Sequence, residues 1–158
     1  MLTTDDIIVR LLVAIALGAV LGLERTFAGK PAGMRTYAMA AIGACSFIIA
    51  DLLASTSIFN VPGSNPIVIE QAVISGIGFI GAGLVIFQNN KVLGVTTAAG
   101  LWVAAAIGIA SGFGYFTLAI LSTGAAMLVF TVLKFIENAL DRRFAYKGLD
   151  TEKEESGK

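Results

Sequence analysis

Long apolar stretches separated by short connections fill almost the whole chain. Each stretch holds about twenty residues, the length that an α-helix with a rise of ~1.5 Å per residue needs to cross a ~30 Å hydrocarbon core. The pattern therefore predicts an all-α, multi-pass membrane bundle of five transmembrane helices. The expected spans are Ile7–Leu23, Tyr37–Leu53, Val68–Phe87, Val95–Ala110 and Tyr115–Ile136.

The composition supports this class of protein. Of the 158 residues, 56% are hydrophobic and only 14% are charged, and the mean hydropathy is +0.84. A soluble domain of this size would need far more polar surface. We expect one transmembrane domain over residues 1–140, because its connections are too short to separate two domains. We expect a charged, partly disordered cytoplasmic tail over residues 141–158.

The loop charges predict the orientation in the membrane. Lysine and arginine follow the first, third and fifth spans, whereas the second and fourth connections carry no charge. By the positive-inside rule, the N-terminus lies outside and the C-terminus lies in the cytoplasm. Arg10 is the exception, and Asp6 lies within i,i+4 reach to neutralise it. Thr3 or Thr4 is the expected N-cap of the first helix.

Histidine is absent, and the one cysteine, Cys45, lies inside the second span. The absence removes the usual metal ligand and the usual general base at neutral pH. The sequence also offers no serine or aspartate pair at membrane depth, so we find no nucleophile–base arrangement. We therefore expect a protein that is not an enzyme, and we interpret Cys45 as a packing residue.

Small residues at helical spacing predict close helix–helix contacts, since membrane helices associate through close backbone approach and dispersion. Packing within one bundle is the simplest interpretation; a homodimer interface and a backbone-lined ligand site are the alternatives. Trp102 is expected to pack in the bundle or to line a polar cavity, because its indole N–H needs a partner. The other expected packing residues are Gly18, Gly22, Gly76, Gly78, Gly81, Gly83, Gly100, Ala104 and Gly108.

Polar residues gather at the predicted inner boundary, and we expect the functional surface there. Arg35 begins the second span, where a cation opposes the helix dipole. It should have an acidic partner, and Glu24 is the nearest candidate; a snorkelling arginine and an unpaired glutamate are the alternative. Thr96 and Thr97 can cap the fourth span. The whole set comprises Glu24, Arg25, Arg35, Thr36, Thr96 and Thr97.

Two carboxylates flank the predicted outer loop between the second and third spans. Asp51 ends one span and Glu70 opens the next, so the short loop between them can bring the two together. Carboxylates and water are suitable ligands for Mg²⁺. Solvated helix ends are the simpler alternative. Asp51 and Glu70 are thus the candidate metal ligands, and no other cofactor is expected.

Several motifs together resemble the MgtC/SapB family over about residues 7–135, in order and spacing. The chain looks most like the short SapB-type form, since it stops too soon for the C-terminal ACT-like domain of virulence-associated members. Tyr37 stands where histidine is frequent, and Thr26 where a charged residue is frequent. The motifs are Gly22-Leu23-Glu24-Arg25, Gly33-Met34-Arg35-Thr36, Ser75-Gly76-Ile77-Gly78-Phe79-Ile80-Gly81-Ala82-Gly83, and Thr96-Thr97-Ala98-Ala99 with Leu101-Trp102.

The resemblance implies a five-span, multi-pass protein of the bacterial inner membrane. It also implies a link to growth in low magnesium and, in some pathogens, to survival inside host cells. Family members have been proposed to modulate the F-type ATP synthase, so the resemblance implies a membrane-protein partner of that kind.

Two functions remain open. The first is a non-enzymatic regulator that binds another membrane protein through small-residue helix faces. The second is a transporter or channel for Mg²⁺ or another small solute, acting as a homo-oligomer. Asp51, Glu70 and Glu24 all lie near span ends, whereas ion pathways usually place ionisable groups inside. We favour the regulator, embedded in the lipid bilayer as a homodimer, with no nucleic-acid partner.

Overall fold

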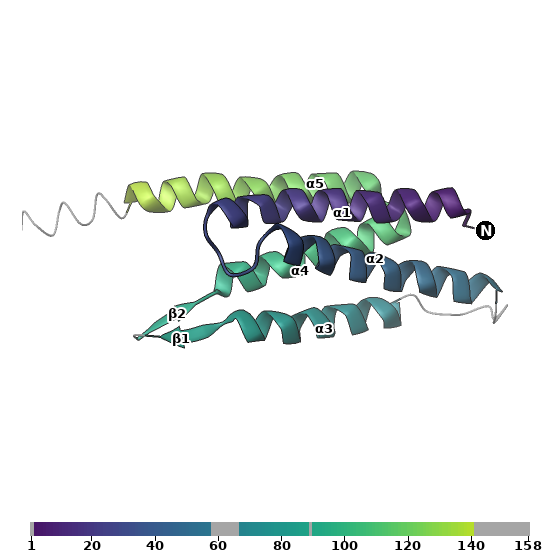
Figure 1. Cartoon of the computed structure of the whole chain (residues 1–158), viewed down its shortest axis with the longest axis horizontal. Coiled ribbons are helices and arrows are strands. Elements are labelled where there is room, and N and C mark those ends of the chain that lie inside the picture. Colours follow the sequence, from purple (N-terminus) through teal and green to yellow (C-terminus); the bar gives the residue numbers. More distant parts are fainter. Residues whose placement is uncertain (1, 58–66, 89, 141–158) are drawn as a thin grey trace, which may run out of the picture. The chain divides into compact units, whose positions relative to one another are not determined.

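The computed structural model describes residues 2–57, 67–88 and 90–140, which form five α-helices and one short β-hairpin (Figure 1). The predicted all-α class is confirmed. After α5, the chain continues through a π-helical segment, Val129–Leu133. The elements are α1 (Thr4–Phe27), α2 (Met34–Ser57), α3 (Ile67–Leu84), β1 (Ile86–Gln88), β2 (Lys91–Leu93), α4 (Val95–Phe113) and α5 (Phe116–Leu128).

The chain divides into two compact units, residues 1–126 and 127–158. The first unit contains α1 to α4, the hairpin and most of α5. In the part that the structure describes, the second unit contains the end of α5, the π-helical segment and the helix that follows it to residue 140. The expected tail, residues 141–158, lies outside the described residues, so the predicted boundary at residue 140 stays a prediction.

Four of the described helices are long and apolar enough to cross a membrane. They are Thr4–Phe27, Met34–Ser55, Val95–Phe113 and Phe116–Leu140. The apolar part of α3, Val68–Leu84, is shorter. The five predicted spans thus correspond to five helices, and the orientation of the bundle across the membrane stays a prediction.

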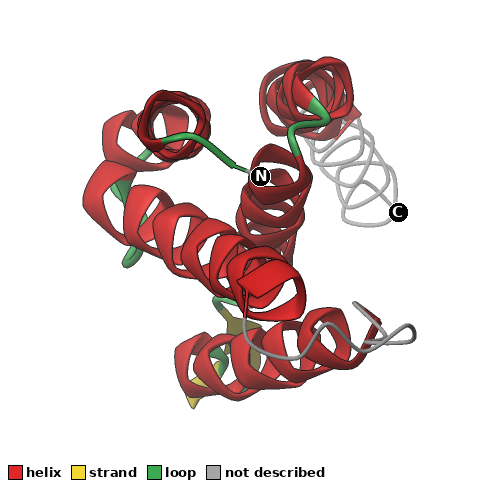
Figure 2. Cartoon of the chain, turned by 90° about the vertical axis from the view of Figure 1, so that its right-hand side faces the viewer, coloured by secondary structure: helices red, strands yellow, loops and turns green. Residues whose placement is uncertain are grey.

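A hairpin joins α3 to α4, where the sequence predicted three more helical residues and a loop (Figure 2, yellow). Its strands are antiparallel, and Gln88 pairs with Lys91. Asn90 in the turn has φ 60°, a left-handed conformation that asparagine tolerates better than most residues. Gly94 has φ 87°, and a side chain there would collide with the carbonyl oxygen of Leu84. A glycine is therefore required where the hairpin returns to the end of α3.

Helix α1 begins with a capping box formed by Thr3 and Asp6. The Thr3 hydroxyl accepts a hydrogen bond from the Asp6 amide over 3.2 Å, and the Asp6 carboxylate accepts one from the Thr3 amide over 2.9 Å. These two bonds satisfy amides that the first turn of a helix leaves without partners. Of the two predicted N-caps, Thr3 has this role.

Arg10 reaches from α1 to the end of α4. Its Nη1 donates a hydrogen bond of 2.6 Å to the carbonyl oxygen of Gly112, a residue 102 positions later in the chain. The last four carbonyls of a helix lack partners within it, and the helix dipole favours a cation there. The basic residue that the loop-charge pattern left as an exception thus caps a distant helix.

Helix α4 ends three residues later than predicted. Gly114 has φ 84°, and the amide of Tyr115 donates to the carbonyl of Ala110 over 2.8 Å, which closes the helix in a Schellman motif. The expected turn over Ser111–Gly114 is therefore helical through Phe113.

Helices α1, α2 and α4 pack around small residues. An added Cβ at Gly18 on α1 would lie 2.9 Å from the Cβ of Ala41, and one at Gly108 on α4 would collide with the carbonyl oxygen of Ala41. Ala41 and Cys45 on α2 are both fully buried. The centre of α2 is therefore enclosed by α1 on one side and by α4 on the other.

Candidate functional site

The six polar residues predicted at the inner boundary divide into a buried and an exposed group, and we call the six together the polar set. Arg25 and Thr97 are buried, and Glu24 is nearly so. The other three, Arg35, Thr36 and Thr96, are exposed.

Glu24 and Arg25 form an ion pair near the end of α1. Two nitrogens of the guanidinium, Nε and Nη2, contact the same carboxylate oxygen, and the side chains are only 12% and 3% exposed. An arginine buried to this extent would cost several kcal/mol without a carboxylate (about 3–5 kcal/mol when one partner is removed). The predicted pair of Glu24 with Arg35 is therefore wrong, because Glu24 pairs with its neighbour in the chain.

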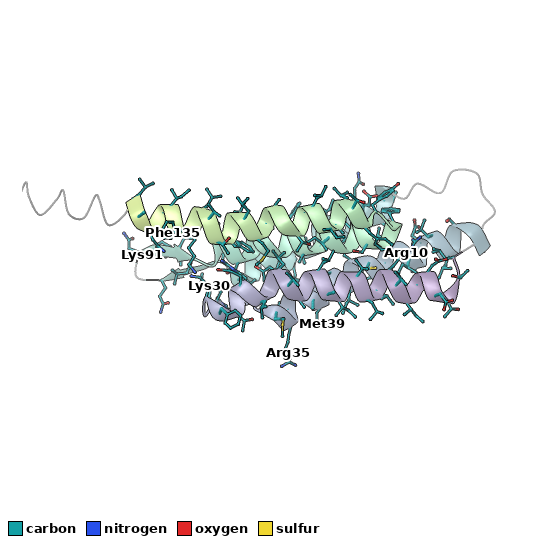
Figure 3. The ribbon with its side chains drawn as sticks, turned by 90° about the horizontal axis from the view of Figure 1, so that it is seen from above. Arg10, Lys30, Arg35, Met39, Lys91 and Phe135 are labelled. Carbon is teal, nitrogen blue, oxygen red and sulfur yellow. The ribbon has the colours of Figure 1, made fainter. Side chains whose placement is uncertain are left out.

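Arg35 lies on the exposed side of α2. Figure 3 shows its side chain pointing away from the helices, close to Met39, which lies one helical turn further along. Arg35 forms no salt bridge with any residue that the structure describes. It misses Glu24 because Tyr37 and Ala41 occupy the inward face of α2, which turns Arg35 outward.

Tyr37 does not belong to the polar set, but it is buried beside Thr97. Its hydroxyl donates a hydrogen bond of 3.0 Å to the backbone carbonyl of Thr97, and the Tyr37 side chain is fully buried. The first turn of α2 and the first turn of α4 are thus joined by a buried hydrogen bond. We call this bond, together with the Glu24–Arg25 pair of α1, which packs on both helices, the buried polar cluster.

Thr26 joins the last turn of α1 to the start of α2. Its hydroxyl donates to the carbonyl of Gly22 over 3.1 Å and accepts from the amide of Met34 over 2.9 Å. A Cβ at Gly33 would lie 2.5 Å from the same hydroxyl, so this close contact requires a glycine. Thr26 and Tyr37 are the two positions at which the chain departs from the family pattern. Those departures were the only feature of the sequence that pointed to these two hydrogen-bonding residues.

The predicted capping role of Thr96 and Thr97 is wrong. The N-cap of α4 is Gly94, which makes no side-chain capping bond. Because Gly94 adopts a left-handed conformation, the helix begins at Val95, and both threonines fall within its first turn. Thr97 is buried there and contributes its carbonyl oxygen to the bond with Tyr37.

The small residues expected at helix contacts occupy different environments. A Cβ at Gly22 would lie 2.6 Å from the Cα of Met34, and one at Gly81 would lie 3.5 Å from the Cβ of Ala98 on α4. A Cβ at Gly76, Gly78 or Gly83, all on α3, would meet none of the described residues within 4 Å.

Trp102 is 47% exposed, although the sequence predicted a place inside the bundle or in a polar cavity. Gly100, Ala104 and Gly108 repeat every four residues and turn their shared face inward, where all three are buried. Trp102 lies midway between the first two, about 200° around the helix from each, and so projects from the opposite face.

The candidate metal ligands Asp51 and Glu70 lie on α2 and α3, and each is partly buried. The residues that the structure describes contain no group of three or more histidine, cysteine, aspartate or glutamate side chains that could hold a metal ion. Most of the loop between the two carboxylates, residues 58–66, lies outside the described part. A magnesium site of two carboxylates and water stays a prediction.

These observations define a multi-pass membrane protein whose helices are joined by a buried polar cluster. Residues 11–139 match the model of the MgtC family, and the chain belongs to that family. The recognition made from the motifs is confirmed. No solved structure matches the chain.

Curated relatives carry two kinds of name. The Escherichia coli K12 protein named "Putative magnesium transporter YhiD" is 38% identical over 133 residues, which cover 83% of this chain and 61% of that protein. "Protein MgtC" of Salmonella typhimurium 14028s is 40% identical over 116 residues, which cover 73% of this chain and 47% of that protein. The chain therefore spans about half to three fifths of the length of these relatives.

Proposed function

We propose that the chain is a non-enzymatic protein of the bacterial inner membrane that acts by binding other membrane proteins and is linked to magnesium homeostasis. A contrast between helices carries the proposal. Gly18 and Gly108 are used to pack α1, α2 and α4 together, whereas Gly78 on α3 has open space beside it. A glycine on a membrane helix permits the backbone of another helix to approach closely. We expect that helix to belong to a partner or to a second copy of the chain.

The face of α3 around Gly78 is also lined by small residues. Ser75 and Ala82 lie three and four residues from Gly78, on the same side of the helix, and both are exposed. Small side chains at this spacing lower the steric barrier to a helix crossing here. The relatives' names do not indicate an enzyme.

The test is capture of membrane partners by the intact chain and by Gly78→Leu, in cells grown in low and high magnesium. The leucine fills space that the described residues leave open, so thermal stability in detergent should not fall. Gly124→Leu is the matched control, because a Cβ at Gly124 on α5 also meets nothing within 4 Å. Loss of capture by Gly78→Leu alone is the expected result. Equal capture by all three proteins would contradict the proposal.

A magnesium transporter formed by several copies is the second candidate, and the name of the Escherichia coli relative favours it. Purified protein in liposomes that contain a magnesium-sensitive dye separates the two functions. The regulator predicts no saturable magnesium flux from the protein alone. Rapid flux that Asp51→Asn or Glu70→Gln abolishes would favour the transporter.

A further inference from the structure

A groove of about 500 Å³ lies between α2 and α3. Its walls are almost wholly apolar, and glycines open both of them: a Cβ at Gly43 on α2 or at Gly76 on α3 would meet nothing within 4 Å. Met39 marks the end of the groove nearest the start of α2. The walls include Met39, Gly43 and Phe47 on α2 and Val73, Gly76 and Ile80 on α3.

Arg35 lies next to this end of the groove. It precedes Met39 by four residues, so the two share one face of α2 and stand about 6 Å apart along the helix. Figure 3 shows both side chains on the same side of the ribbon. The Arg35 side chain is exposed and has no acidic partner among the described residues.

The position of Arg35 is unfavourable without an external anion. A cation in the first turn of a helix is repelled by the positive end of the dipole, whereas an anion is attracted by both the dipole and the guanidinium. Arginine binds phosphate through two parallel hydrogen bonds, which makes phosphate a better partner here than a halide. The Thr36 hydroxyl, also exposed, is a second donor beside it.

We propose that this groove and Arg35 form a binding site for an anionic phospholipid, with an acyl chain in the groove and the headgroup phosphate on Arg35. Within a membrane, the apolar groove gains little from an acyl chain, because lipid tails are already in an apolar medium. Selectivity must therefore come from the headgroup charge. An unpaired arginine immediately beyond an apolar groove has the charge and position that such a lipid requires.

The experiment uses the full chain, purified in a neutral detergent and exchanged with phosphatidylglycerol or phosphatidylcholine that carry identical acyl chains. Retained lipid is measured by native mass spectrometry. We expect phosphatidylglycerol to be preferred by about fivefold, the effect of one basic residue beside an anionic lipid, because the choline of phosphatidylcholine cancels the charge of its phosphate. Arg35→Gln should abolish the preference. Lys30→Gln should keep it, because Lys30 is an exposed cation that does not line the groove.

Gly76→Leu fills the groove without touching Arg35 and should release the lipid while leaving the thermal stability of the lipid-free protein unchanged. Four outcomes would overturn the proposal. The first two are equal retention of the two lipids and equal effects of the Arg35 and Lys30 substitutions on that retention. The third is protection against thermal unfolding by inorganic phosphate that is as strong as protection by phosphatidylglycerol. The fourth is a Gly76→Leu variant that no longer forms a homodimer but still retains the lipid.

Discussion

Replacing Gly22 with alanine tests how closely α1 approaches the start of α2. The added Cβ would lie 2.6 Å from the Cα of Met34, and 2.9 Å from both the Met34 nitrogen and the Gly33 carbonyl oxygen. Cβ atoms essentially never come within 3.0 Å of a non-bonded heavy atom from another part of the chain. All three obstacles are backbone atoms, so no side-chain rotation relieves the clash. The start of α2 must move by at least about 0.4 Å, the difference between 2.6 Å and 3.0 Å.

That movement also affects the hydrogen bond that holds the two helices together. The Met34 amide donates to Thr26 over 2.9 Å, and a shift of about 0.4 Å away from α1 takes this distance beyond the usual 2.7–3.2 Å. Overpacking costs about 1–3 kcal/mol, and a weakened hydrogen bond up to about 1.5 kcal/mol. The helix preference of alanine over glycine returns at most about 1 kcal/mol. We expect a net loss of about 1–3 kcal/mol.

The assay is thermal unfolding of the purified chain in a mild detergent, followed by circular dichroism at a helical wavelength. A loss of this size in a chain of 158 residues corresponds to a Tm lower by roughly 2 to 12 °C. The control is Gly78→Ala, which adds the same methyl group where a Cβ meets nothing within 4 Å. It should leave the Tm unchanged or raise it slightly.

The reasoning depends on the difference in Tm between these two substitutions. If Gly22→Ala stabilises the protein as much as Gly78→Ala does, the close approach of α1 to Met34 is refuted. If both variants lose stability equally, the open space beside Gly78 is refuted, because the loss would then require a neighbour at that position.

The same melting assay checks three further substitutions. Arg10→Leu removes the cap on the end of α4 and should cost about 1–3 kcal/mol, with Arg10→Lys intermediate. Tyr37→Phe deletes the hydrogen bond to the Thr97 carbonyl and should cost about 0.5–1.5 kcal/mol; an unchanged Tm would show that this bond is unimportant. Glu24→Gln removes the carboxylate that pairs with the buried Arg25 and should cost about 3–5 kcal/mol, and a loss below 1 kcal/mol would contradict a buried pair.

The helices could be predicted from the sequence because their signal is long and local. About twenty consecutive apolar residues can satisfy their backbone in lipid only as a helix or a closed barrel, and each predicted span contains a helix. The end of α3 was harder to predict. Val85, Ile86 and Phe87 are as apolar as the helix before them, and they are also good strand residues. The left-handed backbone at Asn90 and Gly94 decides in favour of a hairpin.

The polar contacts could be predicted only where the two partners are close in sequence. The Thr3 cap follows from a local motif, and the structure contains it. The contact of Arg10 with the end of α4 depends on how α1 and α4 pack, which no local pattern records. The partner of Glu24 was predicted from the order of the spans alone. That argument ignored which face of α2 turns inward, and Tyr37 rather than Arg35 occupies the inward face.

The glycines on α3 show why spacing alone does not identify a contact. Gly18 on α1 and Gly108 on α4 face Ala41 across closed interfaces, whereas a Cβ at Gly78 on α3 would meet none of the described residues within 4 Å. Within the described first unit, α3 packs mainly on α4, with Gly81 against Ala98, and borders α2 along the apolar groove. The helix therefore has two surfaces that the described residues leave open.

Those two surfaces lie on opposite sides of α3, so the two proposals can be tested separately. Gly76 lines the groove, and Gly78, two residues later, lies about 200° around the helix. Filling the groove with Gly76→Leu should release phospholipid and leave partner capture intact. Gly78→Leu should abolish partner capture and leave phospholipid bound. A single variant that lost both would mean that lipid and partner depend on one surface. The groove side and the Gly78 side of α3 could then no longer be assigned separate roles in lipid binding and partner binding.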